Sequence, residues 1–218
     1  MPTVEPTPIP VAPTVTHSRL PLRDGARGWR VGHVQERLQW LGYEISAGNL
    51  ANTRFGESTA AAVRRFQMKF SFAPTGVVGT RTWGLLDDLA GKVGRLPSAC
   101  VGQTTICIDK TQRLVRLVVK ATVRLTLDAR FGFVGAATHE GTFRVNSKSR
   151  DHVSSLYRTA MPFALFFSGS QAVHYSPYFA RDGYNGGSHG CVNLRDYDGA
   201  RWLFDQVAVG TRVHVYRS

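Results

Sequence analysis

Residues 21–93 carry hydrophobic positions at the spacing of α-helices. In VGHVQERLQWLGY, residues 31–43, apolar side chains recur every three or four positions, and a glycine stands where the helix would end. A second helix is expected to begin near Ser58 or Thr59, and a third is expected after Thr80, which would cap it. These helices would share one small core around the following residues: Leu38, Phe66 and Trp83. The pattern predicts a small three-helix domain.

Beyond residue 103 the hydrophobic pattern alternates, as is typical of β-strands. The stretch TTICIDKTQRLVRLVVK, residues 104–120, is rich in β-branched residues and has turn residues at Asp109–Gln112. One helix is expected near residues 195–207. Further strands are expected over five segments: 121–135, 141–149, 162–169, 171–176 and 211–218. Short strands separated by turns predict a mainly antiparallel β sandwich or barrel, so the whole chain is expected to be an α+β multidomain protein.

Changes of composition divide the chain further. Five of the first 13 residues are proline, which predicts a stiff linker rich in proline and threonine over residues 1–20. A helical domain over residues 21–93, a second linker over 94–102 and a strand-rich domain over 103–218 would follow. The opening residues lack the basic and apolar regions of a secretion signal, so a signal or anchor absent from this sequence is expected to precede them.

The chain is strongly basic, with a formal net charge of +12. Arginine accounts for 22 of the 27 basic residues, and these are scattered rather than gathered into one arm. Such a distribution suits work beside a polyanion: nucleic acid, an anionic membrane surface or a bacterial cell wall. Charge alone does not choose among these, and no apolar run reaches the roughly 18 residues that would cross a membrane.

The three cysteines leave at least one unpaired. Cys100 and Cys107 are close enough in sequence to be bridged in an exported protein, and they could equally be two buried thiols in a reduced one. Cys191 stands in a glycine-rich loop, two residues after His189 and 17 after His174. A thiol that attacks a carbonyl carbon needs a base nearby and amide donors for the oxyanion, and this loop could provide both.

Other interpretations of these residues remain open. A free cysteine is more often a buried core residue than a nucleophile. Cys191 could also bind zinc with His189, His174 and His152, although the spacings lack the paired short-range ligands of structural zinc sites. His17 and His33 are expected to be solvated. His139 and His214, which sit among strand residues, are expected to be structural.

Two segments resemble known families. RDGARGWRVGHVQERLQWLGY, FGESTAAAVRRFQ and TGVVGTRTWGLL, within residues 22–90, resemble the peptidoglycan-binding domain of cell-wall enzymes. HYSPYFARDGYNGGSHGCVN, residues 174–193, resembles the active-site signature of L,D-transpeptidases of the YkuD type, and this second resemblance covers about residues 103–217.

The second resemblance implies a role for each residue of the signature. Cys191 would be the nucleophile and His174 its base, with the carbonyl of Tyr175 orienting the imidazole ring. His189 and Gly190 would line the site and, with the Cys191 amide, shape the oxyanion hole.

The surrounding residues complete this interpretation. Ser188 would brace the loop. Asn193 stands where many members have arginine, which marks a subgroup and leaves open which residue holds the substrate carboxylate. Tyr157, in the segment expected to cover the substrate, is predicted to belong to a lid.

The resemblance also implies a reaction. The thiolate would cleave the bond before the terminal D-Ala of a peptidoglycan tetrapeptide donor, and an amine on an acceptor stem would then form a 3→3 cross-link without metal or cofactor. The protein would be an extracytoplasmic monomer at the cell wall, near anionic wall polymers and without a role in nucleic-acid binding. A cell-wall hydrolase or L,D-carboxypeptidase with the same cysteine, and a non-catalytic peptidoglycan-binding protein, are the alternatives.

Overall fold

The computed structural model describes residues 19–91 and 93–218. The predicted linker over residues 1–20 lies almost entirely outside the described residues, as does His17. In the described part of the chain, no helix is both long enough and apolar enough to span a membrane.

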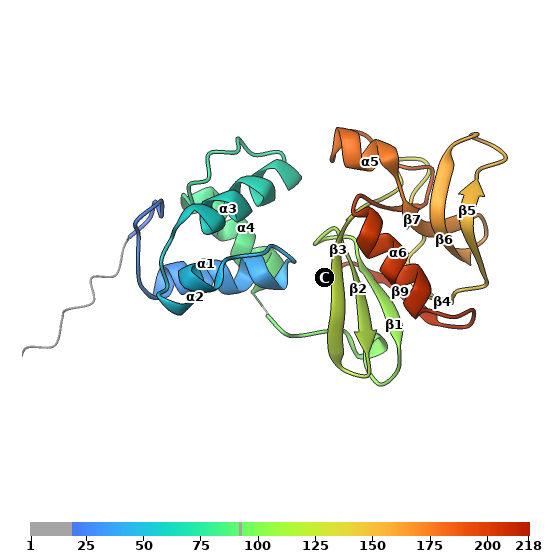
Figure 1. Cartoon of the computed structure of the whole chain (residues 1–218), viewed down its shortest axis with the longest axis horizontal. Coiled ribbons are helices and arrows are strands. Elements are labelled where there is room, and N and C mark those ends of the chain that lie inside the picture. Colours follow the sequence, from blue (N-terminus) through green and yellow to red (C-terminus); the bar gives the residue numbers. More distant parts are fainter. Residues whose placement is uncertain (1–18, 92) are drawn as a thin grey trace, which may run out of the picture.

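Four α-helices form the first body of the molecule (Figure 1): α1 (Trp29–Trp40), α2 (Ala47–Ala51), α3 (Glu57–Lys69) and α4 (Thr80–Ala90). The three predicted helices are present as α1, α3 and α4, and they pack around the expected apolar positions. The short α2 was not predicted, because five residues give no readable period. The expected cap at Thr80 is wrong by one position: Gly79 occupies the cap, without a side-chain hydrogen bond, and Thr80 begins the helix.

The second body is one mixed sheet of nine strands in the order β4-β9-β1-β2-β3-β8-β7-β6-β5. The pairs β1–β9 and β7–β8 are parallel, and the other six pairs are antiparallel. A mainly antiparallel fold is therefore confirmed, with two parallel pairs added to it. The strand bounds are β1 Thr105–Asp109, β2 Leu114–Val119, β3 Thr122–Arg130, β4 Gly141–Arg144, β5 Ser147–Val153, β6 Ala160–Ser168, β7 Gln171–Tyr175, β8 Val192–Leu194 and β9 Arg212–Tyr216.

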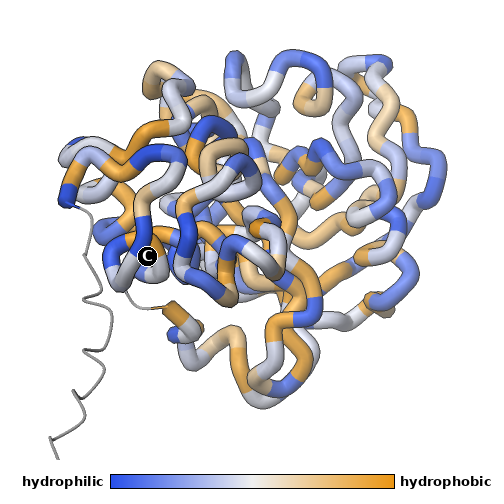
Figure 2. The backbone as a smooth tube through the Cα atoms, turned by 60° about the vertical axis from the view of Figure 1, so that its left-hand side comes forward, coloured by the Kyte–Doolittle hydropathy of each residue, from blue (hydrophilic) through white to orange (hydrophobic). Residues whose placement is uncertain are grey.

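The sheet curls, so that β4 at one edge approaches β6 near the other. The rings of Phe143 and Phe167 lie 5.6 Å apart, and the amide of Asn146 donates to the carbonyl of Phe166 at 2.8 Å. Hydrophobic and hydrophilic residues alternate along much of the chain (Figure 2), although every residue of β1 and β8 is buried.

Two helices accompany this sheet, where one was expected. The predicted helix is α6 (Tyr197–Gln206), whose residues Ala200, Leu203 and Phe204 lie in the core of the sheet. The additional helix is α5 (Pro177–Asp182), which follows β7 directly. Its start carries a sequence signal, because Ser176 caps it by accepting a hydrogen bond from the Phe179 amide and a proline occupies the first turn.

The turn and strand after β1 fasten the helical body to the sheet. Gln112 donates to the carbonyl of Leu89 at 2.7 Å, Arg113 to that of Lys69 at 2.7 Å, and Arg116 to that of Trp40 at 3.0 Å. Each acceptor lies at or next to the last residue of α4, α3 or α1, where helix carbonyls lack partners within their own helix. Three polar side chains of the sheet therefore satisfy the ends of all three long helices.

A disulfide joins Cys100 and Cys107, between the 3-10 turn at Ser98–Cys100 and β1. Both cysteines are buried together with Val118 in a small cluster of their own. Of the two arrangements compatible with the sequence, the structure contains the bridge, which is typical of proteins in oxidising compartments.

Candidate active site

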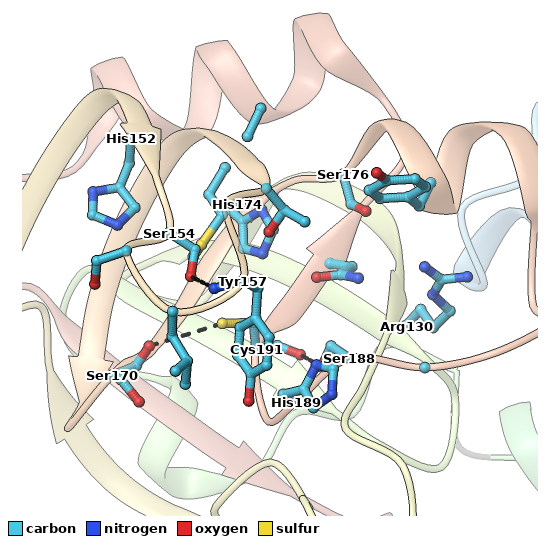
Figure 3. A pocket seen from close by; sticks show the side chains of 18 of the residues that line it. Arg130, His152, Ser154, Tyr157, Ser170, His174, Ser176, Ser188, His189 and Cys191 are labelled. Atoms are coloured by element: carbon cyan, nitrogen blue, oxygen red, sulfur yellow. Dashed lines mark hydrogen bonds between the residues drawn. The ribbon is translucent and has the colours of Figure 1, made fainter.

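The parallel pairing of β7 with β8 brings the residues of the signature together. His174 on β7 is the register partner of Asn193 on β8, and Cys191 immediately precedes β8. All three line a cavity of about 640 Å³. Figure 3 shows the side chains of His174 and Cys191 in this cavity, with His152 and Ser170 to one side and Arg130 to the other.

His174 is almost fully buried and is held as one tautomer. Its Nδ1 lies 2.6 Å from the carbonyl oxygen of Tyr175, which can only accept, so Nδ1 carries the proton. In the neutral ring the lone pair is then on Nε2. Burial lowers the pKa of His174 to about 4, although the hydrogen bond to Tyr175 opposes this shift. At neutral pH the ring is an uncharged base.

Cys191 is a half-buried free thiol. Burial raises its pKa above the ordinary value, while a backbone hydrogen bond from Ala172 opposes that rise. Its sulfur lies 3.9 Å from the carbonyl oxygen of Ser170, at the outer limit for a thiol hydrogen bond. The resting site thus pairs a neutral thiol with a neutral imidazole, and no pre-formed thiolate–imidazolium pair is favoured.

The loop before Cys191 is pinned to the segment that follows β3. The Ser188 amide donates to the carbonyl of Phe131 at 3.0 Å, and the Phe133 amide donates to the carbonyl of Ser188 at 3.1 Å. The Ser188 hydroxyl donates to the Cys191 carbonyl at 2.5 Å and accepts from the Gly190 amide at 3.2 Å. Ser188 therefore braces the loop from its backbone and its side chain together.

Gly190 is required by its conformation and by its surroundings. Its φ of +106° favours glycine, and an added Cβ would lie 2.5 Å from the Gln171 amide nitrogen. Gln171 is itself fixed, because it donates to the Ala137 carbonyl at 3.0 Å and accepts from the His139 amide at 2.9 Å. Since the Gly190 amide donates to Ser188, that amide is already occupied in the resting loop.

His189 lies between two aromatic rings at the mouth of the cavity. Tyr157 stacks on it with ring centroids 4.1 Å apart, and Phe133 meets it edge-on at 4.8 Å. Tyr157 is 47% exposed and belongs to the turn between β5 and β6. The geometry gives His189 a packing role between this turn and the loop, at a different place from the buried ring of His174.

The other expected residues are divided between the cavity and the core. Asn193 lines the cavity, but the side chain of Tyr175 packs against Tyr197 and the core, and only its carbonyl serves the site. His139 lies in a loop before β4, contrary to its expected strand position, and its ring bonds with Ser168.

Metal binding is not supported by the described residues. In residues 19–91 and 93–218, no group of three or more histidine, cysteine, aspartate or glutamate side chains is placed to hold a metal ion. The candidate zinc ligands His152, His174, His189 and Cys191 all fall within these ranges.

Several residues of the cavity were not predicted as site residues: Arg130, Ser170, Ser176 and Tyr178. Arg130 ends β3 and is 6% exposed, which is unusual for arginine. Its sequence context is an ordinary alternating strand, so only the pairing of β3 with β8 reveals that it faces the site.

Two family models match the chain. Residues 103–215 match the L,D-transpeptidase catalytic domain, YkuD. Residues 27–86 match the putative peptidoglycan binding domain. The comparison with curated proteins gives no significant match.

Similar solved structures cover nearly the whole chain. An L,D-transpeptidase from Stackebrandtia nassauensis is 23% identical, with a TM-score of 0.59, over 94% of this chain and 97% of that one. An L,D-transpeptidase from Xylanimonas cellulosilytica is 29% identical, with a TM-score of 0.57, over 91% of this chain and 98% of that one. The first match shows the common fold, and both extend over the helical body as well as the sheet.

Proposed function

The chain belongs to the L,D-transpeptidase family of the YkuD type, and we propose that it forms 3→3 cross-links in peptidoglycan through a thioester on Cys191. That it is an L,D-transpeptidase with an N-terminal peptidoglycan-binding domain follows from the family matches. The roles of individual residues and the identity of the bond are the proposal, and they rest on the geometry of the cavity.

In the first half-reaction the Cys191 sulfur attacks the carbonyl carbon of the third residue of a tetrapeptide stem. Nε2 of His174 takes the thiol proton as the C–S bond forms, because a free thiolate is disfavoured in the buried site. Collapse of the tetrahedral intermediate breaks the C–N bond to D-Ala. The imidazolium of His174 returns the proton to the departing amine, and a thioester remains.

The oxyanion of that intermediate needs backbone donors. The Gly190 amide is occupied by Ser188, so the Cys191 amide is the donor that we assign to the oxyanion. Gly190 and Ser188 then act by fixing the path of the loop, because the Ser188 hydroxyl holds the Cys191 carbonyl and the adjoining peptide.

In the second half-reaction a neutral side-chain amine of a neighbouring stem attacks the thioester. A C–N bond forms, the C–S bond breaks, and the proton lost by the amine passes through His174 to the sulfur. Water in place of the amine would yield a tripeptide and an L,D-carboxypeptidase activity from the same site. The balance between the two depends on how well the acceptor is held.

The hydrogen bond from His174 Nδ1 to the Tyr175 carbonyl is the observation that supports this mechanism most. It leaves Nε2 as a base in the cavity that also contains the only free thiol of the described chain. Asn193, beside His174 in the register, places no charge next to the base.

The helical domain provides a physical reason for efficient use of a polymeric substrate. A binding domain attached to an enzyme raises the effective concentration of tethered stems around the active site. Peptidoglycan is thus the partner of both domains, which corresponds to a place at the cell wall. We propose that the scattered arginines add attraction to anionic polymers of that wall.

Acylation by a carbapenem, followed by intact-protein mass spectrometry, tests the proposed nucleophile and base. We expect one drug adduct on the native chain, no adduct on Cys191→Ala, and adduct formation at least 100-fold slower on His174→Gln. His214→Gln is the matched control, because His214 lies on β9 outside the active-site cavity.

A native chain that carries a free thiol and forms no adduct would contradict the catalytic assignment in favour of a binding role. Muropeptide products then distinguish the reactions. Dimers linked through the third residues of two stems indicate transfer, while tripeptide monomers alone indicate a hydrolase.

A further inference from the structure

A second cavity, of about 340 Å³, lies behind the loop that leads to Cys191. Arg130 and Gly187 line both this cavity and the active-site cavity, so the two spaces meet at these residues. The loop that Ser188 pins to Phe131–Phe133 forms the partition between them. A molecule in the second cavity would therefore approach the catalytic loop from a space that Tyr157 does not line.

The second cavity has a strongly basic lining. Its charged residues are Lys110, Arg113, Arg130 and Arg217, and no acidic side chain lines it. Two carboxylates lie near this lining: Glu140 accepts hydrogen bonds from Lys110 at 2.6 Å and from Arg217 at 2.9 Å, and the charge of Asp182 acts on Arg130. Two carboxylates against four cations leave an excess of positive charge, which favours an anionic ligand.

Arg130 is the buried member of this set and has unused donors. Its Nη1 donates to the carbonyls of Gly183 at 2.9 Å and Asn185 at 3.0 Å. Its Nε is buried without a hydrogen-bond partner among the described residues. An unpaired buried donor calls for a functional or structural explanation. Nε and Nη2 form the edge of a guanidinium that binds a carboxylate through two parallel hydrogen bonds.

We propose that this cavity is the acceptor subsite, and that Arg130 binds the carboxylate beside the attacking amine of the acceptor stem. This inference rests on the proposed transpeptidase function and gives it a substrate-positioning residue. The donor acyl group is covalently bound at Cys191 in the first cavity, so the acceptor needs a separate approach to the thioester. A carboxylate held where the two cavities meet would direct the neighbouring amine toward the thioester carbonyl.

The surrounding residues fit a small anionic group better than a long polymer. Tyr184, Phe131 and Phe133 contribute apolar walls, and Gly186 and Gly187 line the cavity at the partition. Such a site accepts the end of a diamino acid, with its apolar chain against the rings and its carboxylate on Arg130. Arg217, whose side chain is 63% exposed, would attract the stem from solvent.

The test compares acceptors and variants in a transfer assay with a purified tetrapeptide donor. One acceptor stem carries a free carboxylate beside its amine, and the other carries the amide at that position. We expect the native enzyme to show an acceptor KM at least tenfold lower for the free carboxylate. Arg130→Gln should remove this preference, and Arg130→Lys should restore part of it.

Acylation by a carbapenem serves as the internal reference, because it needs no acceptor. Arg130→Gln should reduce transfer at least tenfold more than it reduces acylation, and should raise the share of hydrolysed donor. Arg217→Gln should raise the acceptor KM about twofold to fivefold, with a smaller effect at high salt. Arg201→Gln is the matched control, because Arg201 lies on α6 and lines neither cavity.

Three results would overturn the proposal. The first is equal KM values of the native enzyme for the free and amidated acceptors. The second is an equal loss of acylation and transfer in Arg130→Gln, which would make Arg130 only a brace of the Gly183–Asn185 segment. The third is competition by inorganic phosphate or a phosphate-rich wall polymer without any acceptor preference. Failure of the native enzyme to be acylated at all would instead contradict the proposed function, so the two failures are distinguishable.

Discussion

Buried ionisable side chains are charged at the junction between the two bodies, but the thiol and the imidazole of the catalytic cavity are uncharged. At the junction, the fully buried ammonium of Lys69 lies 2.6 Å from Asp128, which also pairs with Arg195. In the cavity, the Cys191 thiol and the His174 ring are uncharged at neutral pH and form no ion pair. The buried charges at the junction thus neutralise one another without a ligand, whereas Cys191 and His174 provide no such pair of charges in the cavity.

This difference follows from what each region has to do. Burial alone would raise the pKa of Asp128, but Lys69 and Arg195 together keep it below the ordinary value, so the carboxylate stays charged. Burial lowers the pKa of Lys69 to about 8, against the attraction of Asp128. Such a pair needs a fixed geometry, since a buried charge that loses its partner is strongly destabilising. The junction can therefore hold the wall-binding domain in one orientation relative to the sheet.

The two regions are also close along the chain. Asp128 and Arg130 are neighbours on β3, and Arg195 follows β8, which begins directly after Cys191. Strand β3 therefore carries one residue of the junction ion cluster, Asp128, and one residue of the active-site cavity, Arg130. Variants in each region should therefore separate stability from catalysis.

The largest effect is expected when the base is removed. His174→Gln keeps a side chain of similar size but no basic nitrogen, so the rate of carbapenem acylation should fall about 100-fold to 10,000-fold. The unfolding midpoint in urea at pH 7 should change little, because the neutral histidine contributes no charge there. A large loss of stability with the loss of activity would mean that His174 is chiefly a core residue.

The opposite outcome is expected at the junction. Lys69→Met leaves the buried Asp128 with Arg195 alone, and the free energy of unfolding should fall by about 3 kcal/mol. Acylation of the folded variant should stay within twofold of the native rate. Lys120→Met, in an exposed turn, is the matched control and should leave the urea midpoint unchanged.

A double variant tests whether Lys69 and Asp128 interact directly. Adding Asp128→Asn to Lys69→Met removes the carboxylate that was left with Arg195 alone, so the double variant should lose less stability than the sum of the two single variants. Additive losses in the double variant would contradict direct coupling of Lys69 with Asp128.

The pH dependence of stability distinguishes the buried base from the ion cluster. His174 has a folded pKa of about 4 and an unfolded value near 6.5, so between these values the unfolded chain binds the additional proton. Stability due to this group is therefore complete above about pH 6.5 and falls as the pH drops toward 4, by about 2 kcal/mol at pH 5.

Urea denaturation of the native chain and of His174→Gln at pH 7 and pH 5 measures this contribution. The native chain should lose about 2 kcal/mol more than the variant over this interval. Equal losses would show that the folded pKa of His174 is close to its ordinary value. The acid limb of the acylation rate should lie near pH 4 for the same reason.

The sequence predicts these regions unequally. The helices α1, α3 and α4 and most strands were predictable, because each has a period that can be seen within a dozen residues. Cys191 and His174 were identifiable as candidates from a dense local motif. The start of α5 was also readable, at Ser176 followed by proline, and was missed because the helix has only six residues.

The charge relations could not be predicted. Lys69 and Asp128 are 59 residues apart, and Lys69 ends an amphipathic helix where a solvated lysine is the ordinary expectation. The sequence does not distinguish Arg130 from the other arginines among the 22. Its place at the site becomes evident only from the pairing of β3 with β8. The Lys69–Asp128 pair and the position of Arg130 both depend on strand order and domain docking, and these depend on contacts between residues far apart in the chain. The tautomer of His174 likewise depends on the local path of the backbone at Tyr175.

The smallest effect is expected at the mouth of the cavity, and it tests whether Tyr157 covers the substrate. Tyr157→Ala removes the ring that stacks on His189, and this should slow acylation about fivefold, because an exposed aromatic contact contributes about 1 kcal/mol. Tyr157→Phe keeps the stacking and should act like the native residue. Tyr197→Ala is a poor control, since that ring packs on Phe163 in the core, whereas Tyr178→Phe removes only a hydroxyl from another tyrosine that lines the cavity. An unchanged rate in Tyr157→Ala, measured by stopped-flow at a low carbapenem concentration, would remove Tyr157 from the lid and leave His189 held by Phe133 alone.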